Sequence, residues 1–153
     1  MAVETFKATT TLSGKGMKVD AQARTHHIVI DEPQSLGGTD EGMNPVELVL
    51  AALGACQSIV AQVYAKKFDV SYDELRIDLE GDLDTDGFLN ISDVRPGFSE
   101  IRYKIHLKTD EPEEKIQPFI QFIEQKCPVG DTIANHVRLA YTGFEIEKPT
   151  TSK

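Results

Sequence analysis

Residues 44–67, NPVELVLAALGACQSIVAQVYAKK, decide the fold of this chain of 153 residues. Asn44 is a good helix N-cap, Pro45 suits the first helical position, and the Glu47 carboxylate can reach back to the N–H of the cap. Almost every residue from Pro45 to Val63 is apolar or small, so we expect the helix to be covered on all sides. The sequence therefore predicts a long helix at the centre of the molecule or against a partner chain.

Segments with alternating apolar and polar residues flank this helix, and such alternation is typical of antiparallel strands. Residues 1–31 predict a hairpin and a third strand, followed by a loop rich in glycine. Residues 72–108 predict two more strands joined by an acidic loop over 81–99. Strands that come in runs, separated by helical regions, indicate an α+β fold.

The last part of the chain predicts helices and one strand. Residues 112–135 have apolar side chains at helical spacing, and the helix is expected to break at Cys127-Pro128, because proline removes a backbone donor. Residues 137–147 alternate again and predict a final strand. Because no repeat or linker divides the chain, we expect one domain over residues 1–153.

The composition excludes several classes of function. Lys and Arg number 16 against 25 Asp and Glu, and a formal net charge of −9 repels nucleic acid and anionic membranes. No apolar run is expected to reach the roughly 18 residues of a membrane span, and the N-terminus lacks the pattern of a secretion signal. We therefore expect a cytoplasmic protein, without nucleic-acid or membrane partners, whose cysteines are free thiols.

The two cysteines differ in their predicted surroundings. Cys56 lies about 18 Å along the helix from Asn44, too far for the helix dipole to lower its pKa. Cys127 precedes a proline at a helix start, where unpaired N–H groups favour the thiolate. Glu47 falls on the opposite face of the helix from Cys56, so only a cation or a second subunit can link them. From these residues alone, each thiol could equally be a small packing side chain.

The segment NPVELVLAALGAC over residues 44–56, followed far downstream by Cys127-Pro128-Val129, resembles the family of osmotically induced protein C and the organic hydroperoxide resistance proteins (OsmC/Ohr). The similarity covers nearly the whole chain. It implies antiparallel sheets wrapped around a long buried central helix. It also implies an intertwined homodimer with a site at each end of the interface.

The same resemblance implies a thiol peroxidase that reduces organic hydroperoxides in oxidative stress defence. By the resemblance, Cys56 is the nucleophile that becomes a sulfenic acid, and Cys127 resolves it to a disulfide. It implies no metal and no bound cofactor. An external dithiol, for which a lipoyl group is one candidate, would reduce the disulfide again.

The family supports its thiolate with a glutamate and an arginine, and both are displaced in this chain. The glutamate usually stands ten residues before the first cysteine, where this chain has Val46, and Glu47 follows one position later. The arginine usually lies near the turn of the first hairpin, where this chain has Lys15 and Lys18. Arg24, further along the second strand, is a candidate substitute beside these two lysines. A lysine is a point charge and cannot link both carboxylate and thiolate in a bidentate way, so turnover could be slow or the substrate different.

Two other functions remain open from the residues. In one, an apolar cavity at a dimer interface binds a lipid-like ligand and the thiols are inert. In the other, Cys56 or Cys127 acts with His136 as a hydrolase on an activated ester.

Two patterns suggest metal binding only weakly. The spacing of Asp82, Asp84, Asp86 and Asp93 is close to that of a calcium loop, but we expect strands on both sides, which favours an acidic turn. His26-His27 forms a pair on a strand, where neighbouring side chains point to opposite faces. We therefore predict no metal site.

Overall fold

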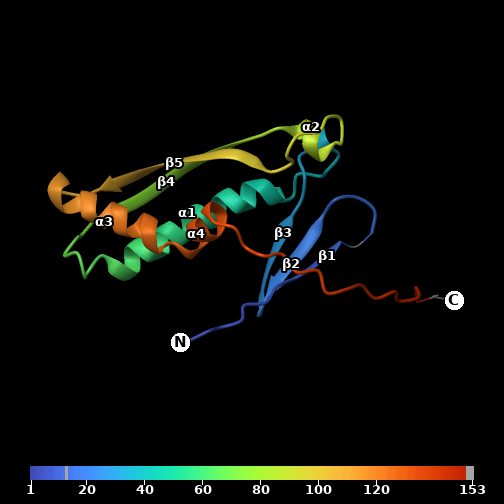
Figure 1. The fold of residues 1–153 in the computed structure, drawn as a ribbon, viewed down its shortest axis with the longest axis horizontal. Helices are drawn as coiled ribbons and strands as arrows, with labels where there is room; N and C mark the ends of the chain where they lie inside the picture. The colour runs from blue at the N-terminus through green and yellow to red at the C-terminus, as the bar shows by residue number, and fades with distance from the viewer. Residues whose placement is uncertain (13, 151–153) are drawn as a thin grey trace.

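The structure is a computed structural model, and it describes residues 1–12 and 14–150. Its strands are β1 (Thr9–Leu12), β2 (Val19–Ala23), β3 (His26–Ile30), β4 (Glu74–Leu83) and β5 (Phe98–Lys108). Its α-helices are α1 (Pro45–Tyr64), α2 (Thr85–Phe88), α3 (Glu113–Lys126) and α4 (Pro128–Ala134), and a short 3-10 helix covers Gln34–Leu36. Two separate antiparallel sheets and segregated helices confirm the predicted α+β class (Figure 1).

Helix α1 begins with the predicted capping box. The Asn44 side chain accepts a hydrogen bond from the Glu47 N–H, and the Glu47 carboxylate accepts one from the Asn44 N–H, each at 2.9 Å. The helix ends at Tyr64, three residues earlier than predicted. Its side chains are covered on one face only, since Ile59 and Val63 are each 65% exposed. Within a single chain, the expected burial on all sides is therefore wrong.

Helix α1 also corrects a second expectation. By length and composition it is apolar enough to cross a membrane, so the prediction that no apolar run approaches a membrane span is wrong. The core helix of a soluble protein passes the same test, and α1 packs against β4, α3 and α4.

The sheet formed by β4 and β5 covers one side of α1. Its register pairs Ile77 with Ile105 and Leu79 with Tyr103. Helix α1 approaches this sheet closely at Gly54, where a Cβ atom would lie 2.7 Å from Leu79 Cδ1. The close approach allows side chains of α1 and β5 to share one cavity.

Helix α3 covers α1 from another side and forms the core with it. The buried core cluster consists of Val60, Ala61, Val70, Phe119 and Ile123. As predicted, the chain breaks at Cys127-Pro128, where α3 ends and α4 begins. This break places Cys127 over α1.

The three-stranded sheet β1-β2-β3 extends beyond the N-terminal end of α1 (Figure 1). The loop that leads from β3 to α1 is organised by Asp31, whose buried carboxylate accepts hydrogen bonds from the N–H groups of Glu32, Thr39 and Glu41. Although Asp31 is buried, the sheet itself is poorly covered within one chain, since Ile28 on β3 is 47% exposed.

No strand forms over residues 137–147, contrary to the prediction. A strand needs a neighbouring strand with which to exchange hydrogen bonds, and this segment pairs with neither sheet in the described chain, although it passes the three-stranded sheet in Figure 1. Its apolar side chains are accordingly exposed, with Leu139 at 94% and Phe144 at 78%. The sequence of this segment does alternate, but within the described chain no neighbouring strand pairs with it.

Candidate active site

The two cysteines, far apart in the sequence, lie side by side in the fold. Cys56 is half-buried on α1, and Cys127 is buried at the junction of α3 and α4. Burial raises the pKa of the Cys127 thiol, and a hydrogen bond with the Cys56 side chain raises it further. Both cysteines are free thiols, so the fold brings two reduced sulfur atoms close together.

The environment of Cys127 combines two opposing influences on its pKa. Its sulfur caps α4 by accepting a hydrogen bond from the Gly130 N–H at 3.2 Å, which lowers the pKa as the sequence suggested. Burial acts in the other direction and outweighs this bond, so the pKa is raised. The expectation that the helix start favours the thiolate of Cys127 is therefore wrong.

Glu47 lies in the first turn of α1, away from the thiols. Its carboxylate is exposed and is occupied by the capping box with Asn44. Among residues 1–12 and 14–150, no hydrogen bond or ion pair joins it to a thiol or to a basic side chain. Its proposed role in supporting the thiolate stays a prediction.

The three candidate cations all belong to the three-stranded sheet and its turns. Arg24 occupies the turn between β2 and β3 with a positive φ of 56° and is exposed. Lys18 forms an ion pair with Glu41 at 3.2 Å, and Lys15 is exposed between β1 and β2. Because this sheet lies beyond the N-terminal end of α1 (Figure 1), the described chain does not bring any of the three to its own thiols.

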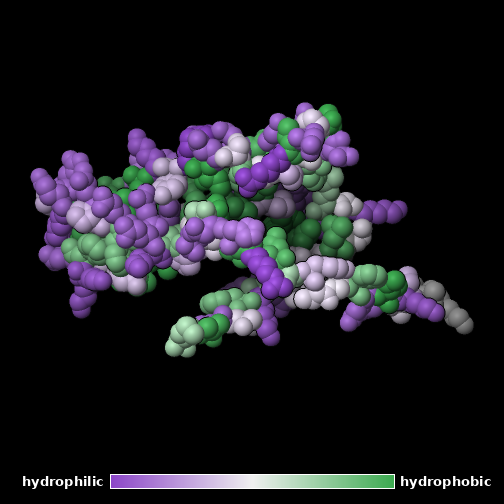
Figure 2. Space-filling model, in the orientation of Figure 1, coloured by the Kyte–Doolittle hydropathy of each residue, from purple (hydrophilic) through white to green (hydrophobic). Residues whose placement is uncertain are grey.

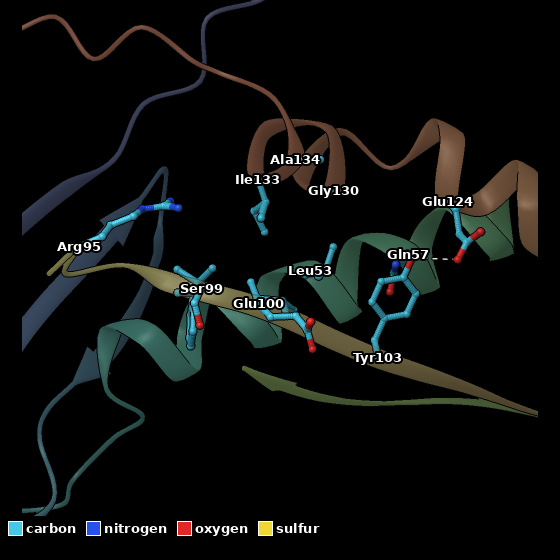
Figure 3. A pocket seen from close by; sticks show the side chains of 13 residues that line it. Leu53, Gln57, Arg95, Ser99, Glu100, Tyr103, Glu124, Gly130, Ile133 and Ala134 are labelled. Carbon is cyan, nitrogen blue, oxygen red and sulfur yellow. Dashed lines mark hydrogen bonds between the residues drawn. The ribbon is translucent and has the colours of Figure 1, made fainter. Parts of the chain in front are cut away.

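A cavity of about 530 Å³ opens between α1, β5 and α4, beside the thiols (Figure 3). Its apolar wall consists of Val49, Leu53, Phe98, Ile101, Ile133 and Ala134, and its polar wall of Gln57, Arg95, Ser99, Glu100, Tyr103 and Glu124. Gly130, which also lines it, connects it to the sulfur atoms, because a Cβ atom there would lie 3.5 Å from Cys127 Sγ. The cavity and Cys127 thus share a wall.

The end of the cavity nearest the thiols is polar. The Tyr103 hydroxyl donates a hydrogen bond to Glu124 at 2.8 Å. Burial, followed by this bond, raises the pKa of Tyr103 to about 12, and nearby Cys127 adds to the shift. Gln57 is 2% exposed, and its Oε1 has no hydrogen-bond donor among the described residues. Figure 3 shows Gln57, Tyr103 and Glu124 gathered at this end.

Sequence reasoning missed these cavity residues. Tyr103 fits the alternation of a half-buried strand, and Arg95 lies in a loop that reads as an acidic connection. Of these residues, Gln57 could have been singled out from the sequence, because it is a polar residue directly after Cys56 in an apolar run.

The other candidates lie outside this site. His136 is exposed in the segment after α4, where no described hydrogen bond links it to a thiol. His27 pairs with Asp20 at 3.1 Å on the three-stranded sheet. The carboxylates of Asp82 and Asp84 are engaged by Arg102 and by the N–H of Asp86. Within the described part of the chain, no group of three or more His, Cys, Asp or Glu side chains could hold a metal ion.

Comparison with known proteins gives consistent matches. A family model described as OsmC-like protein matches residues 38–142. A hydroperoxide reductase of Mycoplasma genitalium is 29% identical over 93 residues, which are 61% of this chain and 63% of the relative. A second hydroperoxide reductase, of Mycoplasma pneumoniae, is 26% identical over 98 residues and is covered to 64%. The chain thus spans less than two thirds of the length of these curated relatives.

Solved structures match over more of the chain. An OsmC like protein from Mycoplasma pneumoniae has a TM-score of 0.75 at 23% identity, with 86% of this chain and 88% of that chain covered. An organic hydroperoxide resistance protein OsmC from Legionella pneumophila has a TM-score of 0.61 at 19% identity, with 87% and 91% covered. At these identities the likeness shows a shared fold.

Proposed function

Because this chain belongs to the OsmC-like protein family, we propose that it reduces organic hydroperoxides with a pair of thiols, Cys56 and Cys127. The family match over residues 38–142 includes both cysteines and confirms the resemblance seen in the sequence. The observation that carries the proposal is the proximity of the two thiols, beside a cavity that has one apolar wall. The names of the relatives, hydroperoxide reductases, point to the same chemistry.

The proposed reaction proceeds in two steps. The Cys56 thiolate attacks the terminal oxygen of the hydroperoxide, an S–O bond forms, the O–O bond breaks, and the alkoxide leaves and takes a proton from solvent. The Cys127 thiol then displaces the hydroxyl of the sulfenic acid, so that an S–S bond forms and water leaves. An external dithiol reduces the disulfide by exchange and becomes oxidised, and the proposed cycle uses no metal or bound cofactor.

The surroundings of the two sulfurs support this division of roles. A nucleophile must be a thiolate, and burial holds Cys127 in its protonated form by raising its pKa. Cys56 is half-buried and is the thiol that an entering substrate can reach more readily. Contact with Cys56 suits Cys127 to the second step, because a neighbouring group reacts at a high effective concentration.

We also propose that the protein is a homodimer. Large apolar side chains that stay exposed in patches mark interaction surfaces. Ile59 and Val63 are uncovered on α1, and the segment after α4 exposes Leu139 and Phe144. Figure 2 shows apolar residues along both terminal segments and in the hollow beside them. A second copy would pair with these surfaces, and its hairpin would supply the cation near the thiols.

Thiol titration before and after one equivalent of an alkyl hydroperoxide tests the peroxidase. We expect the wild type to lose two thiols and to form a Cys56–Cys127 disulfide. A Cys127→Ser variant should instead accumulate a sulfenic acid on Cys56 that a dione reagent traps. Unchanged thiols in the wild type would contradict the proposal and favour a ligand-binding module, and ester turnover without peroxide would favour the hydrolase. We place the protein in the cytoplasm, where a dithiol reductant is available.

A further inference from the structure

The cavity beside the thiols contains one basic side chain, Arg95, among its lining residues. Figure 3 shows its guanidinium reaching in at the end opposite Tyr103 and Glu124. Across residues 1–12 and 14–150, Arg95 forms no ion pair. The guanidinium therefore faces the cavity without a carboxylate partner from the described chain.

The two carboxylates that line the cavity do not neutralise Arg95, because other side chains hold them. Glu100 forms an ion pair with Arg102 on β5, and Glu124 accepts the hydrogen bond from Tyr103. Arg95 is exposed, as are Arg24 and Arg138, which also form no ion pair in the described chain, but Arg95 is the one of the three that lines the cavity. Such an arginine is suited to bind an anionic group, since its planar donors match a carboxylate in bidentate geometry.

The other residues that line the cavity indicate the chemistry of the rest of the ligand. The apolar side chains of Leu53 and Ile133 lie between Arg95 and the polar end (Figure 3). The cavity adjoins Cys127 at Gly130, which lines it and where a Cβ atom would lie 3.5 Å from Cys127 Sγ. A ligand that fills the cavity thus carries an acid at one end, an apolar chain, and its reactive group near the sulfur atoms.

We propose that Arg95 is a specificity-determining residue that selects organic hydroperoxides bearing a carboxylate. The inference rests on the proposed peroxidase function and adds the substrate class. Arg95 holds the carboxylate and the apolar wall holds the alkyl chain. The hydroperoxide group is thereby directed to Cys56, which reacts with it as in the peroxidase cycle proposed above.

The test compares the hydroperoxide of a medium-chain carboxylic acid with its methyl ester. The rate of thiol loss is measured with each, and the ratio of acid rate to ester rate gives the selectivity. We expect Arg95→Gln to lower this ratio about tenfold, the effect of one charge-assisted hydrogen bond. Arg95→Lys should restore part of it, because the charge is kept. The control Arg76→Gln removes an exposed arginine of β4 outside the cavity and should leave the ratio unchanged.

A binding measurement separates this inference from the proposed function. Decanoate, which has no peroxide group, is titrated calorimetrically into the wild type and into Arg95→Gln, and we expect about tenfold weaker binding to the variant. If the wild type consumes both hydroperoxides and Arg95→Gln keeps the wild-type ratio, the role of Arg95 is wrong and the peroxidase stands. If the wild type consumes neither, the peroxidase is wrong, and equal decanoate binding by both proteins would overturn the role of Arg95 as well.

Discussion

At the scale of single residues, Cys127 shows how burial can reverse what a local motif suggests. A sulfur that caps a helix accepts an N–H hydrogen bond, and this alone would favour the thiolate. Cys127 as a whole is 1% exposed, and removing a thiolate from water costs more free energy than one such hydrogen bond returns. The motif therefore locates the thiol but does not determine its charge.

The raised pKa of Cys127 predicts a loss of stability at alkaline pH. The native state holds this proton more tightly than the unfolded chain, so its contribution is complete below the ordinary thiol pKa of 9.0 and is lost as pH rises through the native value. We expect the free energy of unfolding, measured with urea from pH 7 upward, to fall above pH 9.0. Cys127→Ala should flatten this fall, and a profile equally steep in the variant would contradict the prediction.

The buried side chain of Gln57 is expected to lower the stability of the fold. Its buried Oε1 has no donor among the residues that the structure describes, and an unsatisfied buried acceptor costs about 1–3 kcal/mol. We expect Gln57→Met, which keeps the length and removes the acceptor, to raise the free energy of unfolding by about 1 kcal/mol. Denaturation in urea checks this, with exposed Gln121→Met on α3 as the control. A lower stability in Gln57→Met would contradict the prediction and would mean that the amide's hydrogen bond with Tyr103 outweighs the cost of the unsatisfied oxygen.

At the scale of elements, the loop before α1 determines how the helix begins. Asp31 ties this loop to β3, and its N–H donates a hydrogen bond to the Met43 carbonyl at 3.2 Å, just before the N-cap of α1. The loop also passes close to the strand, because a Cβ atom on Gly42 would lie 2.1 Å from the Val29 carbonyl oxygen. The absence of a side chain at this position allows the packing.

Substitution of Gly42 should therefore be more harmful than substitution of Gly54. In Gly42→Ala the new methyl group meets a backbone carbonyl that cannot move alone, and we expect a loss of about 2–3 kcal/mol in unfolding free energy. In Gly54→Ala it meets the tip of the Leu79 side chain, which can rotate, and the helix propensity of alanine offsets part of the cost. Urea denaturation of both variants checks the order, and equal losses would contradict it.

At the scale of the whole molecule, the exposed apolar surfaces are the feature that a single chain does not explain. One face of α1 is open, and the segment after α4 pairs with neither sheet and exposes its apolar side chains. The residues with the pattern of a final strand lie in this segment. A second chain would cover both surfaces, since strand pairing and apolar burial need a neighbour.

A charge placed on the open face of α1 should therefore separate the proposed dimer. We expect Val63→Asp to shift the protein from dimer to monomer at micromolar concentration, because an aspartate would be buried without a partner. Sedimentation velocity measures this shift, and Gln121→Asp on α3 controls for the added charge. A monomeric wild type would contradict the dimer directly.

Local sequence patterns were sufficient to predict most of the elements, the family and the positions of the two thiols, but not the absence of a strand over residues 137–147. Capping residues, apolar periodicity and short motifs act over neighbouring positions, so α1, the break at Cys127 and the α+β class could be predicted from them. The packing of distant segments was needed to reveal the proximity of the two thiols, the burial that raises the pKa of Cys127, and the cavity lined by both Arg95 and Tyr103. These depend on which distant segments pack together, and no local pattern encodes the electrostatics of that packing.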